Sequence, residues 1–154
     1  MFNTTSKTTI LMVEDDENDV YLFEREFIRL MDRIRVRRVK DGVEATEYLE
    51  GVGEYSDRVK YPLPGVILLD LGLPRINGLE FLEWLRSCFH GHNERTPVIV
   101  LSSSSLEADV QAASEAGANA FLTKPARWEH LLEQFQRLGI PLAGQGGPPE
   151  VLRR

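Results

Sequence analysis

The feature that most constrains the fold is a short apolar run that ends in a carboxylate. Val66 to Leu69 are consecutive apolar residues, Asp70 follows them directly, and Gly72 and Pro74 come soon after. An apolar run bounded by turn residues predicts a strand that is buried on both faces, as in a parallel sheet. Asp70 would then lie at the carboxyl end of that strand, where open α/β sheets bind ligands. Taken alone, Asp70 fits an ordinary loop residue equally well, so the rest of the chain must decide.

The hydrophobic pattern alternates between strand and helix along the chain. The predicted strands are residues 9–13, 34–39, 66–70, 97–101 and 119–123. The predicted helices are residues 20–30, 43–49, 79–85, 106–116 and 127–138. Strands separated by helices imply right-handed crossovers and a parallel sheet covered on both faces. We therefore predict a doubly wound α/β fold with five parallel strands and five helices.

Local signals predict where some of these elements begin and end. Asn18 or Asp19 is expected to cap the first helix and Ser105 the fourth, because short polar side chains accept hydrogen bonds from free N–H groups. Gly117 is expected to end the fourth helix. The alternating pattern of residues 34–39 predicts a more exposed strand near the sheet edge.

Composition narrows the classes of function. A chain of 154 residues is one ordinary domain, and its net charge of −6 argues against a nucleic-acid binder, which usually carries a basic surface. One cysteine excludes an internal disulfide and suits a reducing compartment. No apolar run is long enough to span a membrane. We therefore expect a cytoplasmic protein with neither nucleic acid nor membrane as a partner.

Polar side chains follow four of the five predicted strands. Glu14 and Asp15 follow the first strand, Asp70 ends the third, and Ser102 and Lys124 follow the fourth and fifth. Because parallel strands bring their carboxyl ends to one edge, these groups should gather there. Grouped carboxylates repel one another and need a cation, and oxygen ligands with open positions suit Mg²⁺. With Mg²⁺ bound, Asp70 could attack a phosphorus atom and become an aspartyl phosphate, with Lys124 and Ser102 stabilising the phosphoryl oxygens.

The order and spacing of these residues resemble the receiver domain of two-component response regulators, over residues 8–138. The matching residues are Glu14-Asp15, Asp70 with Pro74 and Gly78, Ser102, and Lys124-Pro125. The resemblance implies a flavodoxin-like, CheY-like fold. It also implies that Asp70 accepts a phosphoryl group from a sensor histidine kinase. Residues 1–7 and the Gly- and Pro-rich residues 139–154 are then expected to be a flexible N-terminus and a flexible C-terminal tail.

The resemblance also assigns the metal ligands. Asp15, Asp70 and the backbone carbonyl of Gly72 would hold Mg²⁺ directly, and Glu14 would act through water. Mn²⁺ or Ca²⁺ would be able to substitute for Mg²⁺.

The phosphoryl group and the switch are assigned in the same way. Lys124 would bind the phosphoryl group, next to a Lys124–Pro125 bond that is expected to be cis. Ser102 and Phe121 would form the switch pair, with Phe121 standing where many receivers have Tyr.

Further features are similar to small stand-alone receivers that partner bacterial phytochromes and related kinases. These features are the Glu-Asp-Asp start at Glu14 and the long loops 51–65 and 87–96. Sixteen residues follow Leu138, too few for a DNA-binding module. We therefore expect a single-domain response regulator that is a phosphoprotein and not an enzyme, beyond self-catalysed phosphoryl acceptance and slow autodephosphorylation.

The signal is then expected to leave through a surface of the domain. The expected surface combines helix 106–116, strand 119–123 and helix 127–138, and it would bind a second copy or another partner. Trp128 is a candidate for a dimer contact, with ordinary core packing as the alternative.

Other functions fit the sequence less well. A flavodoxin needs a phosphate-cradling loop after the first strand, where this chain is acidic. A phosphatase of the haloacid dehalogenase type needs a second Asp where Gly72 stands. His90 and His92 could suggest a metal pair, but no further ligand has helpful spacing. A phosphate sink, a phosphate shuttle or a non-switching scaffold receiver stays open as an alternative function.

Overall fold

The computed structural model describes residues 7–72, 77–87 and 95–143. Within them the chain alternates between strands and helices, as predicted. The strands are β1 (Thr8–Val13), β2 (Ile34–Val39), β3 (Val66–Asp70), β4 (Val98–Ser102) and β5 (Ala120–Thr123). The helices are α1 (Glu17–Phe27), α2 (Gly42–Glu50), α3 (Gly78–Ser87), α4 (Glu107–Ala116) and α5 (Trp128–Arg137). Two short 3₁₀ helices, η1 (Ile28–Leu30) and η2 (Gly53–Ser56), lie between them.

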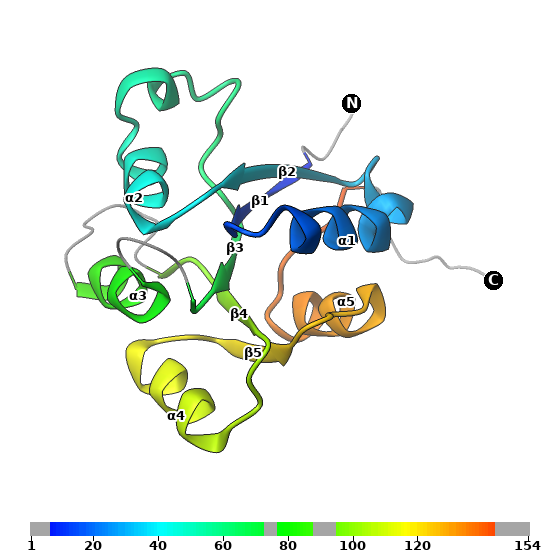
Figure 1. The fold of residues 1–154 in the computed structure, drawn as a ribbon. Helices are drawn as coiled ribbons and strands as arrows, with labels where there is room; N and C mark the ends of the chain where they lie inside the picture. Colours follow the sequence, from blue (N-terminus) through cyan, green and yellow to red (C-terminus); the bar gives the residue numbers. More distant parts are fainter. Residues whose placement is uncertain (1–6, 73–76, 88–94, 144–154) are drawn as a thin grey trace.

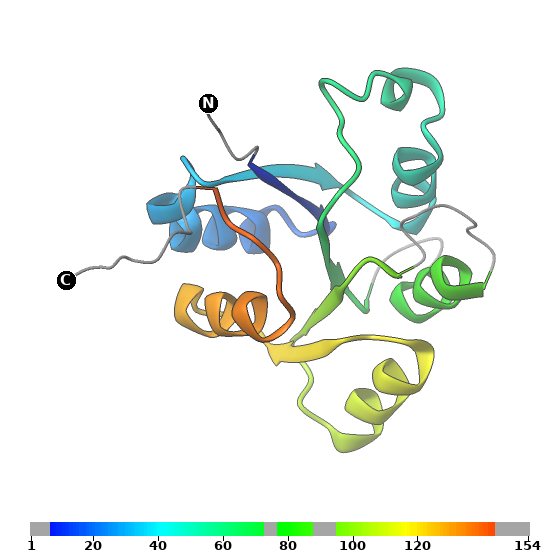
Figure 2. The ribbon, with the colours of Figure 1, turned by 180° about the vertical axis from the view of Figure 1, so that it is seen from behind.

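All strands are parallel and form one sheet in the order β2-β1-β3-β4-β5. Helices α1 and α5 cover one face, and α2, α3 and α4 cover the other (Figure 1). The view from behind shows the same two layers of helices on either side of the strands (Figure 2). This architecture confirms the predicted CheY-like fold and the edge position of β2.

The core has two parts because the inner strands are apolar on both faces. Phe23 and Phe27 of α1 and Phe135 of α5 pack on one face of the sheet. Helix α3 places Phe81 and Leu82 on the other face. The central strand therefore has no exposed side apart from its carboxyl end, as the apolar run at residues 66–69 predicted.

Two of the predicted helix caps are wrong. Helix α1 is capped by Asp16, whose carboxylate accepts hydrogen bonds from the N–H groups of both Asn18 and Asp19. Helix α4 follows Leu106 and has no side-chain cap, so Ser105 does not have the predicted role. Gly117 does end α4, with a φ of 110° that disfavours any residue with a side chain.

The expectation of a disordered tail from Gly139 onward is wrong for residues 140–143. Ile140, Leu142 and Ala143 are buried, and the first two pack in the same core cluster as β1 and α1. The Arg33 side chain donates a 3.0 Å hydrogen bond to the Ala143 carbonyl, while the Ala143 N–H donates to the Arg33 carbonyl. The Gly and Pro content of this stretch predicted flexibility, but its apolar residues pack against the sheet.

Among the described residues, no helix has both the length and the apolar character needed to cross a membrane.

Candidate functional site

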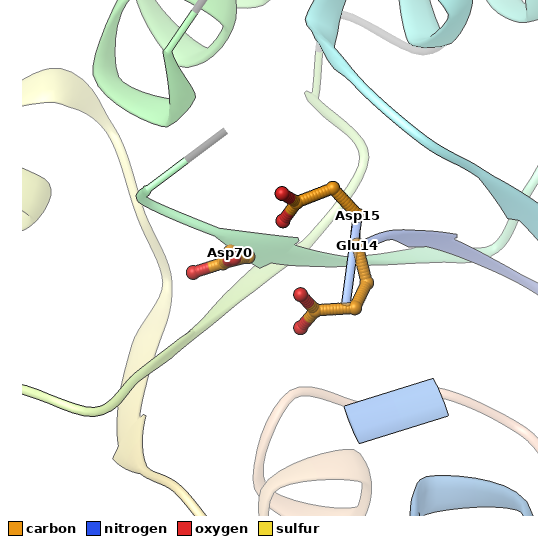
Figure 3. Close-up of side chains that lie close together, drawn as sticks. All are labelled: Glu14, Asp15 and Asp70. Atoms are coloured by element: carbon orange, nitrogen blue, oxygen red, sulfur yellow. The ribbon is translucent and has the colours of Figure 1, made fainter. Parts of the chain in front are cut away.

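Three carboxylates meet at the carboxyl edge of the sheet, where β1 and β3 end. Glu14 and Asp15 directly follow β1, and Asp70 is the last residue of β3. Val13 pairs with Leu69, so the two strands end level with each other. One oxygen of each of Glu14, Asp15 and Asp70 lies within 4.8 Å of the others (Figure 3).

Glu14 is the most buried of the three acids. Its side chain is only 2% exposed, and one carboxylate oxygen accepts a 3.2 Å hydrogen bond from the Asp16 N–H. The Arg38 Nε donates a 2.8 Å hydrogen bond to the Glu14 backbone carbonyl and so fixes the start of the loop. Burial raises the pKa of Glu14 to about 7, the nearby Asp70 charge adds to the increase, and the hydrogen bond from Lys124 opposes it.

Lys124 joins this cluster from the end of β5. Its Nζ lies 2.7 Å from a Glu14 oxygen and 2.7 Å from an Asp19 oxygen, and 3.6 Å from Asp70 Oδ2. Burial acts to lower the pKa of Lys124, but hydrogen bonds to Asp19 and Glu14 together with the Asp70 charge raise it overall. Lys124 is therefore held as an ammonium ion in contact with acids from two different segments. The Lys124–Pro125 bond is cis, as expected.

The backbone after Asp70 leaves no room for a side chain at one position. A Cβ on Gly78 would lie 2.6 Å from the Leu71 Cα and 2.7 Å from the Asp70 carbonyl oxygen. The Gly78 N–H also donates to the Leu71 carbonyl at 3.1 Å. Gly78 therefore allows the start of α3 to lie directly against the strand end that carries Asp70.

Ser102 and Phe121 lie on neighbouring strands. Ser102 is buried at the end of β4, and its hydroxyl accepts a 3.1 Å hydrogen bond from the Ser104 N–H. In the register Val100 pairs with Phe121, so the side chains of Ser102 and Phe121 are on the same face of the sheet, two positions apart. Phe121 is half-buried and packs against the cluster under α3 and α4.

The donor set at this edge fits a hard divalent cation. Three carboxylates offer oxygen atoms at short mutual distances, and Asp15 is exposed, which leaves room for water or a phosphate oxygen. Mg²⁺ favours one or two protein carboxylates together with such exchangeable ligands. The structure thus brings together Glu14, Asp15, Asp70 and Lys124, while their chemical roles stay predictions.

A cavity of about 320 Å³ opens beside the cluster, between α1 and the connection from β5 to α5. Asp19 and Lys124 form part of its polar wall, and Leu22, Leu101 and Ala126 contribute to its apolar wall. Glu14 of the carboxylate cluster also lines this cavity, so the cluster and the ion pair between Asp19 and Lys124 both border the opening.

Two polar residues near the site were not predicted. The sequence predicts only a helix cap at Asp19 and only an exposed strand around Arg38. The signal for Asp19 is its place in the acidic stretch of residues 14–19 that follows the first predicted strand. Nothing in the local sequence points to the contact of Arg38 with the Glu14 carbonyl. Pro74, His90 and His92 lie outside the described residues.

Comparison with known proteins gives consistent matches. A family model described as the response regulator receiver domain matches residues 10–136. The chain is 34% identical to the response regulator Rcp1 of Synechocystis sp. over 127 residues, which are 82% of this chain and 83% of Rcp1. A solved structure of the Mn²⁺-bound form of Rcp1 has a TM-score of 0.68 at 33% identity, covering 85% of this chain and 91% of that one.

Two phytochrome-related structures are also similar. The bacteriophytochrome response regulator RtBRR has a TM-score of 0.76 at 37% identity, covering 94% of this chain and 86% of that one. The phosphorylated cyanobacterial phytochrome response regulator RcpA has a TM-score of 0.74 at 31% identity, covering 89% of this chain and 99% of that one.

Proposed function

The chain belongs to the response regulator receiver domain family of two-component systems, and on that premise we propose that Asp70 accepts a phosphoryl group from a sensor histidine kinase in a Mg²⁺-dependent reaction. The observation that carries the proposal is the meeting of Asp70, two further carboxylates and the Lys124 ammonium at one sheet edge. Few other reactions need an acid nucleophile beside both a cation site and a fixed positive charge.

The proposed reaction is an in-line displacement at phosphorus. A carboxylate oxygen of Asp70 forms the new P–O bond while the P–N bond of the kinase phosphohistidine breaks, and the electron pair leaves on the imidazole nitrogen. Lys124 donates hydrogen bonds to a phosphoryl oxygen, and the Ser102 hydroxyl donates to another. Mg²⁺, held by Asp15, Asp70 and the Gly72 carbonyl with Glu14 acting through water, would supply charge neutralisation. Mn²⁺ or Ca²⁺ would substitute, and the Mn²⁺-bound form of Rcp1 supports this cation chemistry.

The kinase partner is proposed to be of the phytochrome type. RtBRR and RcpA are described as bacteriophytochrome and phytochrome response regulators, and both match nearly the whole of this chain. RcpA was solved in a phosphorylated form, which supports phosphorylation as the working chemistry of this branch.

The output is proposed to be a change in the surface formed by α4, β5 and α5, which then binds a second copy or another partner. The packing of α4 supports this choice, because Ala113 is its only buried residue. A phosphate sink or shuttle needs no such change and is the alternative.

The decisive experiment measures intact mass after incubation with acetyl phosphate and Mg²⁺, followed by size-exclusion chromatography with light scattering. The wild type should gain one phosphate, and Asp70→Asn should gain none. Asp15→Asn serves as the matched control, because it keeps the nucleophile and removes a proposed Mg²⁺ ligand. Mg²⁺ should therefore stimulate its phosphorylation far less than that of the wild type. A gain with a shift in oligomer mass supports a switch, and a gain without one supports the sink or shuttle. The absence of any gain would contradict the proposal.

A further inference from the structure

We propose that Asp19 is a positioning residue that competes with the phosphoryl group for the Lys124 ammonium and thereby sets how tightly the phosphorylated state is held. This inference rests on the proposed function of Asp70. In the unmodified protein Asp19 holds Lys124, and phosphorylation draws Lys124 away from it.

The first step is the geometry of Lys124. An ammonium ion has three N–H donors. Lys124 has short 2.7 Å contacts with Glu14 and Asp19, while the nearest Asp70 oxygen is 3.6 Å away, beyond hydrogen-bond distance. Lys124 is therefore close to the phosphoryl position but bonded to other acids.

The second step is the difference between the two acids. The Glu14 side chain is 2% exposed and also accepts from the Asp16 N–H, whereas the Asp19 side chain is 32% exposed. Among the described residues, the Asp19 carboxylate accepts a hydrogen bond from Lys124 alone. Of the two, the bond to Asp19 is the one that Lys124 can give up with the smaller loss.

The third step is electrostatic. A phosphoryl group on Asp70 replaces one negative charge with nearly two and adds strong acceptor oxygens. Charge-assisted bonds to such oxygens are stronger than a partly exposed ion pair. Lys124 therefore moves from Asp19 to the phosphoryl group. Breaking the bond to Asp19 costs free energy, and this cost lowers the net free energy with which the phosphoryl group is held.

The position of Asp19 allows a clean substitution. Asp19 lies in the first turn of α1, but the capping carboxylate is that of Asp16, which accepts from the Asp19 N–H. Asp19→Asn keeps this backbone bond and removes only the charge that holds Lys124. Glu17→Gln removes an equal charge from the same turn, at a side chain that is 75% exposed and pairs with Arg38, and so serves as the matched control.

The experiment measures the affinity for beryllofluoride, an aspartyl phosphate mimic, by fluorine NMR at saturating Mg²⁺. Asp19→Asn should bind beryllofluoride about threefold more tightly than wild type, which is the scale of a partly exposed ion pair. Glu17→Gln should bind like wild type, and Asp19→Glu should restore wild-type affinity. In a Lys124→Gln background, Asp19→Asn should change nothing, because Asp19 acts through Lys124.

Equal or weaker binding by Asp19→Asn would overturn the inference, and so would equal tightening by Glu17→Gln, since that would be a general field effect. Affinity for Mg²⁺ alone, measured by calorimetry, should not tighten in Asp19→Asn. If Asp19→Asn fails to fold, Asp19→Ser provides the same test. A wild-type protein that does not bind beryllofluoride would overturn the proposed function itself, whereas wild-type binding without an Asp19 effect would overturn only this inference.

Discussion

Helices α1 and α5 on one side of the sheet make many more buried contacts than α4 does on the other side. Phe27 and Phe135 are fully buried between the sheet and the α1–α5 pair. The Glu26 carboxylate accepts hydrogen bonds from the Trp128 N–H and the Arg127 side chain, and the Arg29 guanidinium lies 5.4 Å from the centre of the Trp128 ring. These contacts show that Trp128 has a packing role within the domain.

Helix α4 has few such contacts. Ala113 is its only buried residue, and Leu106 before its first turn is 67% exposed. Elements with little buried apolar area open at low free energy. The two ends of the site therefore differ in how firmly they are supported. Glu14 and Asp15 lead into the firmly packed α1, whereas Ser102 leads into the loosely packed α4.

The largest expected effect is on core packing. Phe135→Ala should lower the free energy of unfolding by about 3 to 5 kcal/mol, because it removes a fully buried ring. Leu106→Ala should change it by less than about 0.5 kcal/mol, because that side chain is mostly in water. Urea denaturation followed by circular dichroism measures both. Similar losses in the two variants would remove the contrast between the α1–α5 pair and α4.

Sequence patterns predicted the parts of the fold that depend on neighbouring residues. Apolar runs located the strands, and the parallel topology then placed Glu14, Asp15, Asp70 and Lys124 at one edge. Contacts between distant segments could not be predicted in this way. Asp19 meets a lysine 105 positions away, and Ile140 is buried in a core cluster built from β1, α1 and α5, which no local pattern describes.

The helix caps failed for a related reason. Residues 14 to 19 hold several acids in succession, so any of them could satisfy the first turn of α1. With Asp16 as the cap, the Asp19 carboxylate is bonded to Lys124 instead of to the helix start.

The second prediction concerns pH and belongs to the α1 end of the site. The pKa of Glu14 is about 7 in the folded protein and about 4.5 in a model peptide, so folding favours its protonated form. The stability from this preference is complete below pH 4.5 and is lost as the pH rises through about 7. Without metal, the loss should be about 3 kcal/mol across this window.

Thermal or urea unfolding between pH 4.5 and 8 in the presence of a chelator measures this slope. Glu14→Gln should flatten it, whereas Ser102→Ala, at the α4 end, should leave it in place because a hydroxyl does not titrate in this range. Mg²⁺ should add stability that grows with pH, since the metal binds the carboxylate form. A slope that persists in Glu14→Gln would assign the titration to another group.

The smallest expected effect tests how α4 is joined to the site. The Ser104 hydroxyl donates a 2.6 Å hydrogen bond to Asp109 in the first turn of α4 and accepts a 3.2 Å bond from the Leu106 N–H. Ser104→Ala should therefore cost only about 0.5 kcal/mol of global stability. Ser105→Ala is the matched control, because Ser105 is exposed.

Amide hydrogen exchange should detect local opening of α4 that a measurement of global stability does not resolve. In Ser104→Ala, amide hydrogen exchange in the first turn of α4 should become about twofold faster, since a loss of about 0.5 kcal/mol corresponds to roughly a factor of two. Exchange in α1 should stay unchanged, because Asp16 caps that helix independently. The Ser104 N–H that bonds to the Ser102 hydroxyl remains in the variant, so the two effects can be separated. Equal exchange in Ser104→Ala and Ser105→Ala would mean that α4 is held by its packing on Ala113 alone, and the link from Ser102 to α4 would then have to run through the backbone.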